Sequence, residues 1–75
     1  MTMHDDIAIR TATESDHAAL QRLAALDSGT VPTGRVLIAE VGGEPQAARA
    51  VSGGATIADP FRRTRHLVRM LAVAG

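Results

Sequence analysis

Two glycine pairs in the middle of the chain constrain the fold more than any other feature. Gly42-Gly43 and Gly53-Gly54 interrupt apolar segments, and paired glycines adopt the positive φ angles that tight hairpin turns require. They predict three short antiparallel strands over residues 35–41, 46–51 and 55–58, joined as a meander. Pro45 cannot donate to a strand ladder, so we expect it at the start of the middle strand or at an edge.

A strand and a helix are expected before the meander. Residues 7–12 alternate in character, which predicts a strand. One face carries Ile7, Ile9 and Thr11, and the other carries Ala8, Arg10 and Ala12. Thr13-Glu-Ser-Asp16 has the pattern of a capping box, in which the Asp16 side chain reaches back to the first helical turn. Apolar residues then recur at helical spacing as far as Leu26, and residues 27–34 are expected to form a loop.

A second helix is expected from Asp59-Pro60 to the end of the chain, with Asp59 as its cap and Pro60 in its first turn. Its expected apolar side consists of Leu67, Met70, Leu71 and Ala74. Phe61 is expected to fill the core at the start of this helix. The element order is therefore β-α-β-β-β-α, which predicts one small α+β domain over residues 1–75, with two helices on an antiparallel meander.

The composition predicts a thin core and excludes several functional classes. The chain has 75 residues, of which 14 are alanine and one is aromatic. A chain of this size buries only about 60% of its surface, so its stability is expected to be marginal without a partner. It has no cysteine and no lysine, which excludes disulfides, thiol nucleophiles and Schiff-base lysines. The sequence also predicts neither a signal peptide nor a membrane span, so the cytoplasm is the expected compartment.

The charges are unevenly distributed along the chain. Residues 60–75 hold four arginines and no acid, whereas residues 1–59 have a net charge of −4. Arginine suits phosphates and carboxylates, and so does a helix N-terminus. Arg62, Arg63 and Thr64 are therefore candidate anion-binding residues, together with the amides after Pro60. The alternative is a solvated helix face paired with acids elsewhere in the chain.

Two carboxylates are candidate proton acceptors. Glu40 lies in the most apolar strand, where partial burial would raise its pKa and suit it to act as a base; the alternative is a solvent-facing position near the hairpin end. Asp27 lies at the end of the first helix, where it would orient an amine substrate or form an Asx-turn with Ser28-Gly29. His4, His17 and His66 do not have metal-ligand spacing, so no metal is expected.

Two segments resemble a known enzyme family. Ile9-Arg-Thr-Ala-Thr-Glu-Ser-Asp16, followed by Ala19, Leu20 and Leu23, resembles the opening strand and helix of the GNAT superfamily of N-acetyltransferases. Val36-Leu-Ile-Ala-Glu-Val-Gly-Gly-Glu-Pro-Gln-Ala-Ala48 resembles the hairpin that follows them in that family. The segment 59–64 resembles a short actinobacterial variety. The resemblance implies the N-terminal half of a GNAT domain.

The same resemblance implies acetyl-CoA as a cofactor, bound where the strand after the hairpin meets the next helix. Arg62, Arg63 and Thr64 stand at the place of the family's phosphate loop. This segment contains no glycine, however, and the chain has no tyrosine to match the family's catalytic acid. These departures favour a truncated GNAT-like domain without acetyl transfer.

Such a domain would act as an interaction or regulatory module, as a homodimer or with a protein partner that covers exposed sheet. The alternative is a minimal acetyl-CoA-binding N-acetyltransferase completed by dimerisation, in which Glu40 or Asp27 receives the amine proton. A weaker alternative is nucleic-acid binding through the C-terminal arginines. Nucleic acid is not expected, because zero net charge and a single aromatic provide neither a broad basic surface nor stacking platforms.

Overall fold

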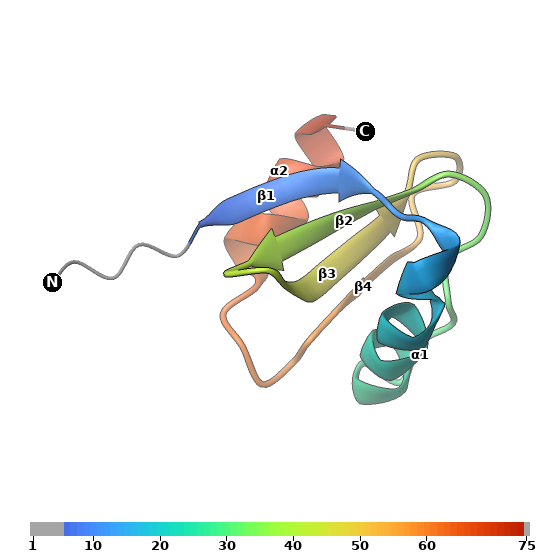
Figure 1. The fold of residues 1–75 in the computed structure, drawn as a ribbon, viewed down its shortest axis with the longest axis horizontal. Coiled ribbons are helices and arrows are strands. Elements are labelled where there is room, and N and C mark those ends of the chain that lie inside the picture. Colours follow the sequence, from blue (N-terminus) through green and yellow to red (C-terminus); the bar gives the residue numbers. More distant parts are fainter. Residues whose placement is uncertain (1–5, 75) are drawn as a thin grey trace, which may run out of the picture.

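The computed structural model describes residues 6–74 and contains an antiparallel sheet with two helices (Figure 1). The elements in chain order are β1 (Ile7–Thr11), the 3-10 turn η1 (Glu14–Asp16), α1 (His17–Leu26), β2 (Val36–Val41), β3 (Glu44–Ala50), β4 (Thr56–Ala58) and α2 (Arg65–Ala74). The four strands lie in the order β1-β2-β3-β4, and each pairs antiparallel with the next. The predicted α+β class, the meander and the two helices are confirmed.

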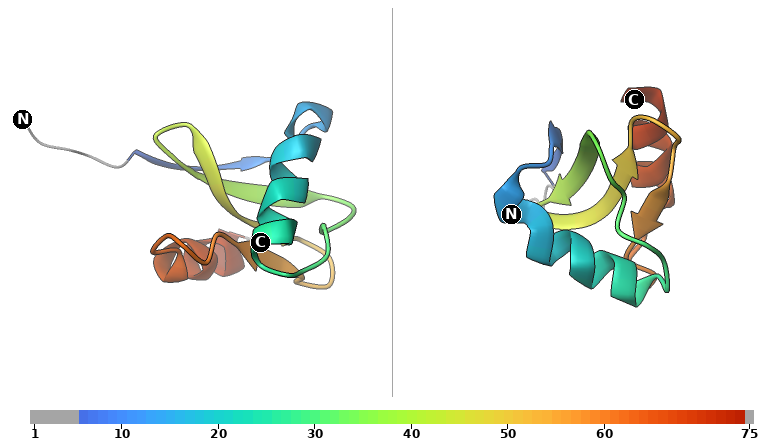
Figure 2. Two further views of the ribbon diagram at one scale, coloured as in Figure 1. Left: turned by 90° about the horizontal axis from the view of Figure 1, so that it is seen from below. Right: turned by 90° about the vertical axis from the view of Figure 1, so that its right-hand side faces the viewer.

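The two helices cover opposite faces of the sheet, so the domain has three layers (Figure 2). α1 packs through Leu20, Leu23 and Ala24 on one face, against Ile38 and Ala48 among others. On the other face, α2 packs against neighbouring strand positions through a second cluster. That cluster consists of Leu67 and Leu71 with Ala39 and Ala47. Because successive side chains of a strand point to opposite faces of the sheet, adjacent residues of β2 and β3 pack against different helices.

The first glycine pair forms the predicted hairpin turn. Gly42 and Gly43 have φ angles of 61° and 84°, and Val41 pairs with Glu44 directly across this two-residue loop. Positive φ at both central positions matches the twist of the flanking strands. β3 therefore begins at Glu44, two residues earlier than predicted, and includes Pro45. The register between β2 and β3 shifts at Ala39 and Glu40, and Glu40 lies opposite Pro45. Proline is tolerated at such an irregularity, although it cannot donate to the strand ladder.

The last helix begins at Arg65 and not at Asp59-Pro60, so this prediction was wrong. The Asp59 carboxylate accepts the Phe61 amide at 2.8 Å, and its carbonyl accepts the Arg62 amide at 3.3 Å. Asp59-Pro60 therefore opens a turn, since proline fits the second position of a turn as well as it fits a helix start. Phe61 is 80% exposed, so its predicted place in the core was also wrong.

Candidate functional site

An ionic cluster joins β1, β2 and the start of the first helix on the α1 side of the sheet. The Arg10 guanidinium donates to both carboxylate oxygens of Asp16, at 2.7 and 2.8 Å, and to Glu40 at 2.8 Å. The Asp16 carboxylate also accepts the Thr13 backbone N–H at 2.7 Å, which completes the predicted capping box. One buried carboxylate thus caps the helix and holds β1.

The hydrogen bonds of this cluster favour the charged forms of Asp16 and Arg10. Hydrogen bonds from the Arg10 guanidinium, and then from the Thr13 backbone, hold the pKa of Asp16 well below its usual range. The same bonds to Asp16, and next to Glu40, raise the pKa of Arg10. The Glu40 side chain is 17% exposed and faces Arg10. The predicted base is therefore neither solvent-facing nor free, because it is a member of an ion pair that bridges β1 and β2.

Asp27 is held at the other end of α1. Its carboxylate accepts the backbone N–H of Ala58 on β4 at 3.2 Å, and this contact replaces the Asx-turn expected from the sequence. The helix ends in a Schellman motif, since Ser28 donates to the Ala25 carbonyl and Gly29 donates to the Ala24 carbonyl. Ser28 occupies the left-handed position of the motif with a φ of 52°.

Asp27 and Glu40 are not brought together. Asp27 follows the last turn of α1, whereas Glu40 is bound through Arg10 to the residue that precedes its first turn. A helix of ten residues is about 15 Å long. The two candidate carboxylates therefore cannot act on the same substrate atom.

The predicted anion-binding residues do lie together, on the loop that leads into α2. Arg62, Arg63 and Thr64 line a hollow of about 470 Å³ with Pro60 and Arg65. A smaller hollow of about 270 Å³ adjoins them, lined by Arg62 and Arg63 with Val41, Gln46 and His66. The guanidinium of Arg62 approaches the Glu44 carboxylate at 3.5 Å, with both side chains about half exposed.

The backbone of this loop differs from the predicted site. The amides of Phe61 and Arg62 are occupied by Asp59, so the first two amides after Pro60 are not free to bind an anion. Thr64 stands directly before α2, and its carbonyl accepts the first helical bond from Val68 at 2.9 Å. The exposed side chains of the basic segment are available to a ligand, whereas the amides of Phe61 and Arg62 are not.

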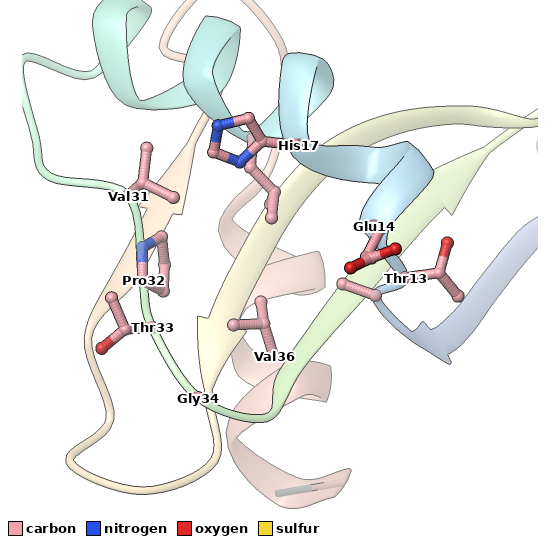
Figure 3. A pocket seen from close by; sticks show the side chains of 10 residues that line it. Thr13, Glu14, His17, Val31, Pro32, Thr33, Gly34 and Val36 are labelled. Carbon is pink, nitrogen blue, oxygen red and sulfur yellow. The ribbon is translucent and has the colours of Figure 1, made fainter.

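A further hollow of about 550 Å³ was not predicted from the sequence (Figure 3). His17 and Glu14, from the start of the first helix, face the extended segment of Val31 and Pro32, with Val36 between them (Figure 3). Its floor is apolar and its polar lining residues are exposed. The clustering of His17 and Glu14 beside a buried proline depends on how loop 27–34 returns to the sheet, which local periodicity does not encode.

Of the helices in residues 6–74, none combines the length and the apolar character that crossing a bilayer requires. Within these residues, no three His, Asp or Glu side chains form a group suited to hold a metal ion. Comparison with known proteins gave no match, either to a protein-family model, to a curated protein or to a solved structure.

Proposed function

We propose that this chain is a truncated GNAT-like domain that acts as an interaction module and does not transfer acetyl groups. The observation that carries the proposal is the engagement of both candidate proton acceptors. Glu40 is paired with Arg10 at 2.8 Å, and Asp27 is bound to the Ala58 amide at 3.2 Å. The β-α-β-β-β-α order and the antiparallel meander are compatible with the N-terminal half of the family's fold, as the sequence resemblance implies.

The chemistry explains why this engagement matters. A general base has to reach the proton that it removes, and its carboxylate has to be free to take that proton up. The Glu40 carboxylate already accepts a hydrogen bond from the Arg10 guanidinium at 2.8 Å, and that contact would have to be given up for Glu40 to serve a substrate. Glu40 therefore stabilises the fold through Arg10, and Asp27 stabilises the edge of β4. Both candidate proton acceptors therefore have structural partners within the fold, which supports a role other than acetyl transfer.

The proposal is tested by a two-dimensional amide NMR titration with acetyl-CoA, together with an acetyl-transfer assay on a mixture of primary amines. We expect a dispersed spectrum that millimolar acetyl-CoA does not shift, and no turnover. Turnover that is lost in Glu40→Gln or Asp27→Asn protein of native fold would overturn the proposal.

A second candidate function is the binding of acetyl-CoA, or of a similar phosphate anion, by the basic loop. It is favoured by Arg62, Arg63 and Arg65 around one hollow, where the Glu44 carboxylate approaches Arg62 no closer than 3.5 Å. In this case the titration would give localised, saturable shifts over residues 58–65. The double substitution Arg62→Ala with Arg63→Ala would then weaken binding about tenfold or more, because each charged hydrogen bond contributes roughly 1.5–3 kcal/mol. Arg22→Ala, on the exposed side of α1, is the matched control and should leave binding unchanged.

The double variant and the Arg22→Ala control also distinguish nucleic-acid binding from cofactor binding. Binding of nucleic acid by these arginines requires an affinity that falls steeply with salt, with a slope that tracks the phosphates neutralised. Acetyl-CoA should then compete for the same residues. Absence of binding to short DNA or RNA at low salt would dispose of this reading.

A further inference from the structure

The outer edge of β1 presents backbone groups that pair with no other strand of residues 6–74. Among them, the Thr11 carbonyl accepts a long hydrogen bond of 3.4 Å from the neighbouring Arg10 guanidinium. Gly42 donates to the Asp6 carbonyl at 3.1 Å, and Ala12 donates to the Val36 carbonyl at 2.7 Å. The backbone groups at even positions of β1 therefore face β2, because the direction alternates along an antiparallel strand. Ile7, Ile9 and Thr11 direct their N–H and C=O groups away from the sheet. β1 is the first strand in the sheet order, so these groups form an open edge.

This edge lacks the usual protection against pairing with another strand. Proteins blunt exposed edges with prolines, outward-facing charges, bulges or very short strands. β1 contains Ile-Ala-Ile-Arg-Thr over five residues, and its register with β2 is regular. Its one charged side chain, Arg10, is directed into the cluster with Asp16 and Glu40. No repulsive group on β1 therefore opposes an added strand.

An apolar hollow lies next to this edge, on the α2 side of the sheet. It has a volume of about 400 Å³, and Ile9, Met70, Val73 and Ala74 line it together with Arg69. Val73 is 84% exposed and Met70 is 40% exposed, while Ile7 on the same face of β1 is 37% exposed. A strand added beside β1 would place its own side chains next to these residues. The open backbone edge and the exposed apolar surface are thus continuous.

We propose that β1 pairs antiparallel with β1 of a second copy of this chain, with the twofold axis at Ile9. The proposal rests on the proposed function, because it names the partner of the interaction module. In this register Ile9 faces Ile9 of the second copy, and Ile7 faces Thr11. The outward groups of all three residues are then satisfied in about six hydrogen bonds. The two sheets join into one, with α2 of both copies on the same face.

The side chains are self-complementary in this arrangement. The two Ile9 side chains meet on the α2 face, beside Met70 and Val73 of each copy. On the other face, Ala8 lies opposite Arg10 of the second copy, so no two like charges are directly opposed. Each Arg10 keeps its own two carboxylate partners. A second copy therefore satisfies the outward backbone groups of β1 and covers the adjacent apolar surface, with no two like charges directly opposed on β1.

The size of the contact predicts a weak dimer. Five paired residues and a small apolar patch fall below the roughly 1,200 Å² of total buried surface at which specific interfaces begin to be stable. We therefore expect a dissociation constant in the micromolar range, about 10–100 μM. Dimerisation would then be controlled by concentration.

The test is sedimentation velocity over a concentration series from about 1 μM to 1 mM, with two pairs of variants. Thr11→Pro removes an outward N–H donor, and Thr11→Ala is the matched control that keeps it. Val73→Lys puts a charge in the apolar patch, and Ala72→Lys puts the same charge on an exposed neighbour outside it. We expect Thr11→Pro and Val73→Lys to weaken the dimer at least tenfold and the two controls to retain it.

Several outcomes would overturn the proposal. One is a protein that stays monomeric at 1 mM; another is a dimer that Val73→Lys and folded Thr11→Pro protein leave intact. If Thr11→Pro does not fold, as judged by its amide spectrum, Val73→Lys decides alone. If the protein is a monomer that neither binds acetyl-CoA nor turns it over, the dimer proposal is wrong, but the proposed absence of acetyl transfer is not contradicted. If a dimer linked through β1 turns over acetyl-CoA, the dimer proposal is supported and the proposed absence of acetyl transfer is wrong.

Discussion

The two edges of the sheet are built in opposite ways. β4 has three residues and is followed directly by Asp59-Pro60, and its outward Ala58 amide is bound by the Asp27 carboxylate. β1 has five residues, and its outward groups pair with no other strand of residues 6–74; the Thr11 carbonyl has only a 3.4 Å contact with the Arg10 guanidinium. One edge is closed from within the chain by the end of α1, while the other is left open beside exposed apolar side chains. The difference teaches that edge protection can depend on one well-placed carboxylate.

Loss of Arg10 should lower the stability most, because Arg10 joins β1 to Asp16 before α1 and to Glu40 on β2. Arg10→Met leaves the Asp16 and Glu40 carboxylates without their cation. Breaking a buried pair costs about 3–5 kcal/mol, and we expect about 2 kcal/mol here, since the Arg10 side chain is 37% exposed and partly screened. Urea unfolding measures the loss. Arg22→Met is the control and should stay within about 0.5 kcal/mol of the parent.

Acid should loosen the same edge without a mutation. Because the pKa of Asp16 is depressed in the folded state, its contribution to stability is present above its unfolded pKa of about 3.9. That contribution is lost as the pH falls below this value towards the folded pKa, since the unfolded chain then binds the proton first. Urea midpoints measured from pH 6 down to pH 2.5 should fall in this window. Arg10→Met protein should show a shallower fall, and an equal fall would contradict this assignment.

Opening the protected edge should have a smaller effect. Asp27→Ala frees the Ala58 amide, at an expected loss of about 1 kcal/mol, reduced by a few tenths because a carboxylate at the C-terminal end of a helix is itself unfavourable. Hydrogen exchange of the Ala58 amide should accelerate. Asp27→Asn keeps an acceptor oxygen and should give an intermediate rate. Unchanged exchange in both variants would mean that Asp27 does not protect this edge.

The smallest effect should come from Ser28, next to Asp27, and it should be stabilising. Ser28 has a φ of 52°, a conformation that costs an L-residue about 1–2 kcal/mol. Ser28→Gly removes that cost but adds freedom to the unfolded chain, so we expect a net gain of about 0.5 kcal/mol. Ser28→Ala keeps the strain and should give no gain. Thermal unfolding compares the three proteins.

Local signals in the sequence predicted the elements that local chemistry determines. The glycine pair at Gly42-Gly43 predicted the hairpin, and the capping box at Thr13 predicted the start of the first helix. The basic loop shows where such signals fail. Asp59-Pro60 is equally suited to open a helix or a turn, and the structure has the turn. Arg62, Arg63 and Thr64 line one hollow, but the helix was expected to begin before them and begins after them.

The partners of the two carboxylates could not be predicted, because they are set by contacts distant in sequence. Arg10 and Glu40 are 30 residues apart, and Asp27 and Ala58 are 31 apart. These pairs depend on the strand register and on which sheet face α1 covers. One signal was present in the sequence. Arg10 lies on the strand face that it shares with Ala8 and Ala12, opposite the face of Ile9 and Thr11. A lone charge on an otherwise small apolar face often requires a counterion.

The hairpin at Gly42-Gly43 has a consequence for the order of folding. β2 and β3 are joined by two residues, so they close the shortest loop between any pair of strands in the sheet, and short loops close at the lowest entropic cost. The segments on either side, β1 with α1 and β4 with α2, can then add from opposite directions. Substitutions at Ala39 or Ala47 should therefore slow refolding, whereas substitutions on β1 should mainly accelerate unfolding. The β2-β3 hairpin would then act as the folding nucleus, and the segments on either side of it would be the first to unfold.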